Sequence, residues 1–191
     1  MSSPNGNSKV GSTPTSRWER ILAYRLLLIL AAGIFIADQI TKIWIIERLP
    51  LGSYGPGHSI TIIPDFFYLV HVGNTGAAWS MLTGKSTLLA FIAIATLVGI
   101  YFWRRELALR DRLGQFAFGL LCGGIIGNLV DRLLHGHVVD FLDFHFGSYI
   151  YPTFNVADSA ICVGVFFYIW HSFRSQPLKK EAETPKDSRT D

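Results

Sequence analysis

The chain has 191 residues, of which 50% are hydrophobic and only 16% are charged, and its mean hydropathy is +0.33. Soluble domains usually carry about 25% charged residues, and disordered or disulfide-rich chains differ still more from this composition. The net charge of +3 is small, and the basic residues do not gather with aromatic residues into a patch that would bind nucleic acid. These numbers indicate a membrane protein.

Four segments have the roughly 20 mostly apolar residues that a helix needs to cross the hydrocarbon core. They are Leu26–Ile46, Ser86–Trp103, Gly114–Leu134 and Phe154–Phe173. We therefore predict an all-α membrane protein in which four transmembrane helices form a single domain over residues 17–175. Residues 1–16 and the charged tail 176–191 are predicted to be disordered ends.

The lysines and arginines predict the orientation, because cytoplasmic connections carry an excess of both residues. Thirteen lie in the N-terminal flank, in the connection between the second and third segments, and in the C-terminal tail. The other two connections contain only Arg48 and Lys85. Both termini are therefore expected in the cytoplasm, with residues 47–85 and 135–153 outside.

The first outer connection has the composition of β-strands. Its stretch Ser59–Val72 is rich in β-branched and aromatic residues and is interrupted by Pro64 and Asp65. We predict a small β-rich extracytoplasmic region between helices one and two.

Polar side chains collect at one depth of the predicted bundle. Ionisable groups inside a span cost several kcal/mol, so they indicate function by default. Those in the spans all fall toward the outer side, and two more polar residues belong to the outer connections. The set comprises Asp38, Lys42, Asn128, Asp131, Arg132, Asn155 and Asp158 in the spans, and Asn74 and Asp140 outside them. We expect a polar site just below the outer membrane surface.

The spacing of these residues leaves structural alternatives open. Asp38 and Lys42 are four residues apart on one helix face, and form either a structural ion pair or a pair that orients substrate. Asn128 and Asn155 are either site residues or, respectively, a packing polar residue and a helix N-cap. Asp131 is expected to be structural, with a pair to Arg132 at the interface as one form of that role.

Three histidines, His135, His137 and His145, lie within eleven residues that also contain Asp140 and Asp143. Such donors bind zinc in many proteins, although no His-Glu-x-x-His motif is present. A metal-dependent membrane hydrolase that uses these three histidines is our alternative hypothesis.

Two aspartates offer a different chemistry. Asp140 lies in the second outer connection and Asp158 at the start of the fourth span, 18 residues later. Two carboxyl groups held close together in a low dielectric cannot both ionise, so one keeps its proton and the other becomes a base. Such a pair activates water, as in aspartic proteases.

Five short motifs, taken together, resemble the bacterial lipoprotein signal peptidases, also called type II signal peptidases. They are Asp38-Gln39-Ile-Thr-Lys42; Asn74-Thr-Gly76-Ala-Ala-Trp79-Ser80; Gly123-Gly-Ile-Ile-Gly127-Asn128-Leu-Val-Asp131-Arg132; His135-Gly-His-Val-Val-Asp140-Phe-Leu-Asp143-Phe; and Phe154-Asn155-Val-Ala-Asp158-Ser-Ala-Ile161. The resemblance covers about residues 26–170.

The resemblance implies a membrane aspartyl endopeptidase of the bacterial inner membrane, with its active site on the extracytoplasmic side. The implied substrates are prolipoproteins with a diacylglyceryl-cysteine, cut on the N-terminal side of that cysteine, and the implied inhibitors are globomycin-type peptides. It implies no cofactor. Asp140 and Asp158 match the family's catalytic pair. The positions that match residues supporting the site are Asp38, Lys42, Asn74, Asn128, Arg132 and Asn155.

Overall fold

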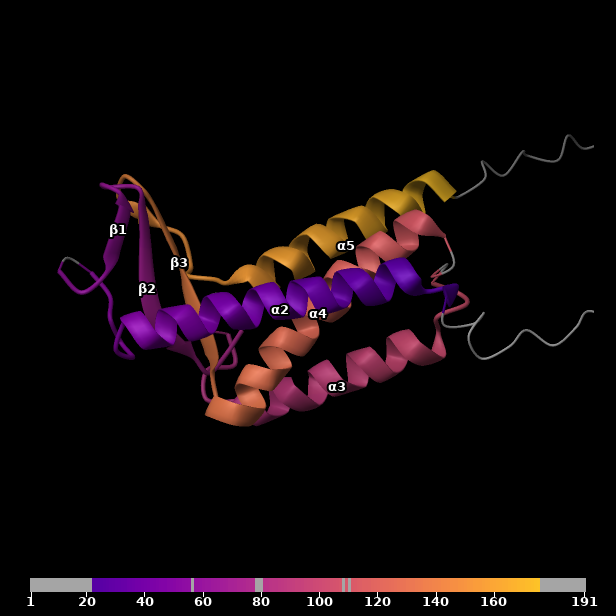
Figure 1. The fold of residues 1–191 in the computed structure, drawn as a ribbon, viewed down its shortest axis with the longest axis horizontal. Helices are drawn as coiled ribbons and strands as arrows, with labels where there is room; N and C mark the ends of the chain where they lie inside the picture. Colours follow the sequence, from indigo (N-terminus) through magenta and orange to yellow (C-terminus); the bar gives the residue numbers. More distant parts are fainter. Residues whose placement is uncertain (1–21, 56, 78–80, 108, 110, 176–191) are drawn as a thin grey trace, which may run out of the picture.

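A computed structural model describes residues 22–55, 57–77, 81–107, 109 and 111–175. Within these residues the helices lie along one another, and a small sheet packs at one end of them (Figure 1). The first and last described residues lie at the opposite end. The predicted termini 1–16 and 176–191 fall outside the described residues.

The helices are α2 (Arg25–Arg48), α3 (Ser86–Phe102), α4 (Arg112–His135) and α5 (Val156–Ser175). Each agrees within about two residues with one predicted apolar segment. By length and composition, α2, α4 and α5 are able to cross a membrane, whereas α3 is also apolar but has only 17 residues.

Helix α4 is the centre of the bundle, because it packs against α2, α3 and α5. Its glycines permit this packing. An added Cβ at Gly119 or Gly123 would collide with α2 at Leu30 or at the Ala31 carbonyl, and one at Gly124 would collide with the Ala157 carbonyl of α5. The spacing of small residues in α4 therefore brings two helices to backbone contact.

The sheet has four antiparallel strands in the order β1 (Ile60–Ile63), β2 (Phe67–Asn74), β3 (Val138–Phe146) and β4 (Tyr149–Ile150). The strands β1 and β2 lie in the predicted β-rich stretch, and Asp65 turns between them with a φ of 59°. Half of the sheet was not predicted: β3 and β4 come from the connection between α4 and α5. The predicted region between the first two helices is thus incomplete, because β2 pairs with a strand more than 60 residues away.

Strand β3 joins the sheet to the bundle. Val139 and Phe141 are buried and pack with Ile45 at the end of α2. Asp140 lies between them in the chain, so its side chain points to the other face of the strand. Packing of the two apolar neighbours therefore orients Asp140 away from the apolar cluster.

Candidate active site

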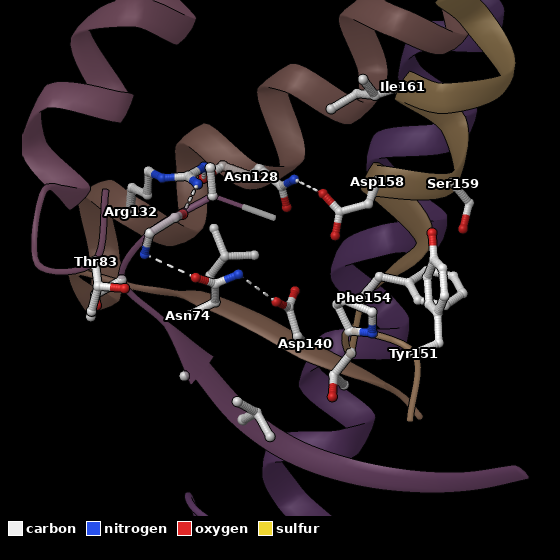
Figure 2. A pocket seen from close by; sticks show the side chains of 18 of the residues that line it. Asn74, Thr83, Asn128, Arg132, Asp140, Tyr151, Phe154, Asp158, Ser159 and Ile161 are labelled. Atoms are coloured by element: carbon white, nitrogen blue, oxygen red, sulfur yellow. Dashed lines mark hydrogen bonds between the residues drawn. The ribbon is translucent and has the colours of Figure 1, made fainter. Parts of the chain in front are cut away.

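Asp140 and Asp158 line one cavity of about 940 Å³, between α4, α5 and the sheet. Figure 2 shows both carboxyl groups turned into this space, one from β3 and one from the first turn of α5. The remaining predicted residues that line it are Asn74, Asn128 and Arg132. Residues from four separate elements therefore meet at one place.

The Asp140 carboxylate is 2% exposed and accepts hydrogen bonds from two amides. Asn74 Nδ2 of β2 lies 2.9 Å from Oδ2, and Asn155 Nδ2 lies 2.8 Å from Oδ1. Burial raises the pKa of Asp140 from 3.8 to about 7, and the nearby charge of Asp158 acts in the same direction. The two amide donors oppose this rise but do not cancel it.

Asp158 and Asn155 cap the beginning of α5 reciprocally. The Asp158 backbone N–H donates to Asn155 Oδ1 over 2.9 Å, and the Asn155 N–H donates to Asp158 Oδ2 over 3.2 Å. This is the capping-box arrangement, in which the side chains of two residues satisfy free N–H groups of the helix start. Asn128 Nδ2 donates to the other Asp158 oxygen over 2.7 Å. The predicted N-cap role of Asn155 is present, together with its contacts in the site.

Asn155 also connects the two carboxyl groups. It is completely buried, and its Nδ2 lies within hydrogen-bonding distance of Asp140 Oδ1, Asn128 Oδ1 and the Val139 carbonyl. Because the same residue caps α5 through its Oδ1, rotation of its side chain would disturb β3, α4 and α5 together.

The Asp38–Lys42 pair lies behind these residues and does not line the cavity. Lys42 is 2% exposed, and its Nζ lies 2.8 Å from Asp38 Oδ2, 2.7 Å from Asp131 Oδ2 and 3.0 Å from Asn128 Oδ1. These three contacts use all three donors of an ammonium group. The geometry therefore favours the structural alternative for this pair.

Asp131 is structural as expected, but it is not paired with Arg132 at the interface. It is 2% exposed, and besides Lys42 it accepts hydrogen bonds from the Val139 N–H over 3.1 Å and from Gln39 Nε2 over 3.0 Å. Gln39 was not predicted as a site residue, although it belongs to the same motif as Asp38 and Lys42.

Arg132 connects α4 to the segment that follows β2. Its guanidinium donates to the Asn128 carbonyl and to the Gly76 carbonyl, each over 3.1 Å, and the Gly76 N–H donates to Asn74 Oδ1 over 2.9 Å. Arg132 thereby holds the segment that positions Asn74 beside Asp140. Trp79 and Ser80 of the same motif fall outside the described residues.

Several cavity residues were not predicted. All of them are uncharged, and they lie either in connections or next to Asn155 and Asp158 in the sequence. They are Tyr54, Thr83, Tyr151, Phe154 and Ser159. Only their nearness to a site in three dimensions identifies them, because they follow no spacing pattern.

The three histidines of the alternative hypothesis do not converge. His145 Nε2 lies 2.7 Å from Asp143 Oδ2, while the rings of His135 and His137 are 6.1 Å apart. Eight residues of extended chain separate His137 from His145, which is about 26 Å. Among the described residues, no group of three or more His, Cys, Asp or Glu side chains has an arrangement that could hold a metal ion. Nothing in this geometry supports the metal hypothesis.

Comparison with known proteins gives a consistent result. A family model described as Signal peptidase (SPase) II matches residues 30–174. The chain is 42% identical over 149 residues to a lipoprotein signal peptidase of Syntrophotalea carbinolica, covering 76% of this chain and 89% of that protein. It is 40% identical over 159 residues to a lipoprotein signal peptidase of Nostoc punctiforme, covering 82% of this chain and 94% of that protein.

A solved structure has the same fold. It is described as a bacterial membrane enzyme determined by the in meso method at 2.3 Å resolution, and it superposes with a TM-score of 0.71 at 35% identity. The match covers 83% of this chain and 93% of the solved one. The chain therefore belongs to the signal peptidase II family, whose members are membrane proteases that process lipoproteins.

Proposed function

We propose that this protein is an aspartic endopeptidase that removes the signal peptide from diacylglyceryl-modified prolipoproteins, on the N-terminal side of the lipidated cysteine. The observation that carries the proposal is the meeting of Asp140 and Asp158 in one cavity, each held by amide donors. The relatives' name, lipoprotein signal peptidase, supports the substrate class.

In the proposed mechanism the pair shares one proton, and Asp140 carries it. Asp158 lies in the first turn of α5, where the helix dipole and the Asn155 N–H stabilise a carboxylate. Asp140 lies on strand β3 outside the helix, and its burial raises its pKa to about 7. Asp158 is therefore the base and Asp140 the acid.

Proton transfers then balance in two steps. Asp158 takes a proton from water while the water oxygen bonds to the scissile carbonyl carbon, and Asp140 gives its proton to the carbonyl oxygen. The resulting diol collapses as Asp158 returns a proton to the leaving nitrogen and Asp140 takes one from a hydroxyl. The C–N bond breaks, and both aspartates are restored.

The lipid part of the substrate is proposed to lie along α5. The cavity extends from Asp158 to Ile161 and to the exposed Cys162, on the side of the helix that faces the bilayer in the proposed arrangement. Burial of acyl chains contributes about 0.8 kcal/mol per methylene, so the diacylglyceryl group supplies much of the recognition. Globomycin-type peptides are expected to compete for the same cavity.

We propose that all four helices span the bacterial inner membrane, with both termini in the cytoplasm and the sheet outside. The 17 residues of α3 extend about 26 Å, slightly less than a typical hydrocarbon core. A local thinning of the bilayer accommodates such a difference at modest cost.

The test is cleavage of a synthetic precursor, with and without its diacylglyceryl group, by purified full-length variants. D140N and D158N should each reduce kcat/KM by about 10³-fold or more, because neither amide can exchange the proton. D65N is the matched control, since Asp65 lies on an exposed turn of the same sheet. Full activity in either dyad variant excludes the mechanism, and equal cleavage of the unmodified precursor excludes the lipid requirement.

A further inference from the structure

A second hollow lies on the opposite side of β3 from the catalytic cavity. This α2 groove has a volume of about 360 Å³ and shares no lining residue with the cavity. Its walls come from the outer part of α2 and from strands β2 and β3. They are Ile40, Thr41, Trp44, Ile45, Leu69 and Phe141.

The walls of the α2 groove suit a hydrocarbon chain. Thr41 is the one residue with a hydroxyl, and that group is already bonded to the carbonyls of Ala37 and Asp38, each at 2.8 Å. Apart from the indole N–H of Trp44, the hydroxyl of Thr41 is the one polar side-chain group of the groove, and it is already bonded. Apolar surface gains from covering by an apolar chain that fits its shape.

A cation lies at the mouth of this groove. Thr41, Trp44, Ile45 and Arg48 follow the i, i+3, i+4, i+7 spacing, so Arg48 continues the groove stripe to the last residue of α2. Its guanidinium lies over the Trp44 ring, 4.9 Å from the ring centre. Within the described residues, this ring is the partner that the structure gives Arg48, and the side chain is exposed. Glu47 lies about 100° around the helix from Arg48.

We propose that the α2 groove binds a membrane phospholipid, with one acyl chain along the groove and the phosphate on Arg48. The distances agree with this orientation. Ile40 lies eight residues before Arg48, or about 12 Å along the helix, from the sheet end of the bundle toward its middle. A guanidinium stacked on an aromatic face keeps its N–H edge free for a bidentate phosphate contact. Charge and hydrophobicity are thus arranged along α2 as they are along a phospholipid.

Such a lipid would contact the reverse side of the catalytic strand. Phe141 faces the groove, and its neighbour Asp140 faces the cavity. A ligand that binds only the folded protein raises its stability, and here the stabilised part includes β3. The site is distinct from substrate binding, because a diacylglyceryl thioether carries no phosphate.

The test is lipid binding to the purified full chain in detergent, followed by native mass spectrometry. The probes are dioleoyl phosphatidylglycerol, dioleoylglycerol and inorganic phosphate. Phosphatidylglycerol should bind about tenfold more tightly than dioleoylglycerol, because only the former has a phosphate for Arg48. A tenfold difference corresponds to about 1.4 kcal/mol for this charge-assisted contact. Inorganic phosphate should not compete. Equal binding of both lipids, or displacement by phosphate alone, overturns the proposal.

Matched variants separate this site from general lipid contact. R48Q should weaken phosphatidylglycerol binding about tenfold, whereas K85Q, which removes an exposed cation before α3, should change it less than about twofold. T41F fills the groove and should weaken binding of both lipids. Equal effects of R48Q and K85Q, or wild-type binding by T41F, would show that the groove is not the site. Neither Arg48 nor Lys85 lines the catalytic cavity, so the result does not depend on the proposed reaction.

Discussion

Lys42 donates a hydrogen bond to Asn128 Oδ1 over 3.0 Å, and this contact determines which way the Asn128 amide faces. With its oxygen toward the ammonium group, Asn128 presents its Nδ2 to Asp158 at 2.7 Å. Lys42 therefore acts on the proposed base through Asn128 without reaching the cavity. It is a positioning residue, and its charge also balances Asp38 and Asp131.

Removal of the Lys42 charge should strongly destabilise the protein. K42M leaves two buried carboxylates without their counter-ion, which costs about 3–5 kcal/mol. Unfolding by SDS titration in mixed micelles measures this loss. The double variant K42M/D131N should recover part of the loss, because one of the two carboxylates is then neutral. Wild-type stability of K42M would contradict this assignment.

Gly127 provides the space for Asp38. A Cβ added at Gly127 would collide with Asp38 Oδ2, while Asp38 Oδ1 accepts a hydrogen bond from the Ala157 N–H at 2.9 Å. G127A should therefore displace the carboxylate from α5 and cost about 1–3 kcal/mol in thermal or SDS unfolding. G33A is the control: Gly33 is an exposed helical residue of α2 with open space around its Cβ position. If both variants unfold alike, the packing argument is wrong.

The pH dependence of cleavage should reflect Asp140. Because its pKa is raised to about 7, the proposed acid loses its proton above that pH, and kcat/KM should decline there. N74A removes a hydrogen bond that favours the ionised form, so it should move this decline upward by about one pH unit. The position of the decline is measured independently of the absolute rate. A downward movement in N74A would reverse the assigned effect.

Stability should depend on pH through the same group. Between pH 3.8 and about 7, the folded protein keeps the Asp140 proton that the unfolded chain has lost. The folded state binds more protons in this window, so the contribution of Asp140 to stability falls as the pH rises. D140N should lack this part of the decline. The melting temperature of D140N relative to that of the wild type should therefore rise from pH 4 to pH 7. A constant difference would contradict the raised pKa.

The three histidines should be dispensable for catalysis. The variant H135A/H137A/H145Q keeps a donor for the buried Asp143, whose Oδ2 lies 2.7 Å from the His145 ring. Its cleavage rate should remain within about threefold of wild type, also in a strong chelator, since none of the three side chains lines the catalytic cavity. A loss of activity that added zinc restores would support the metal-dependent hypothesis instead.

The helical part of the fold was predictable because apolar length is a strong local signal. The four segments required no knowledge of their neighbours, and the polar residues near the sheet end were recognisable from their cost inside a span. Asp158 was found in this way, whereas Asp140 was singled out as a second carboxylate in the neighbouring outer connection; the cavity that they line brings them together.

Strand β3 was missed because its signal is not local. The run Val138–Phe146 begins with four buried residues, so the alternation that marks a half-buried strand is absent. Its partner β2 is distant in sequence, and a pairing such as Val72 with Asp140 cannot be inferred from either strand alone. The roles of Gln39 and Asn128 in orienting charged groups also depend on contacts between helices, which spacing within one helix does not reveal.

The hydrogen bond from Ala157 to Asp38 joins the last helix to the first. A chain is synthesised from its N-terminus, so Asp38, Lys42 and Asp131 are all made before Asn155 and Asp158. The ion-pair cluster is available early, but the proposed base arrives only with the final segment. Under the proposed mechanism, a newly made enzyme would stay inactive toward its substrates until α5 has docked, and truncation anywhere before that helix would remove the proposed base.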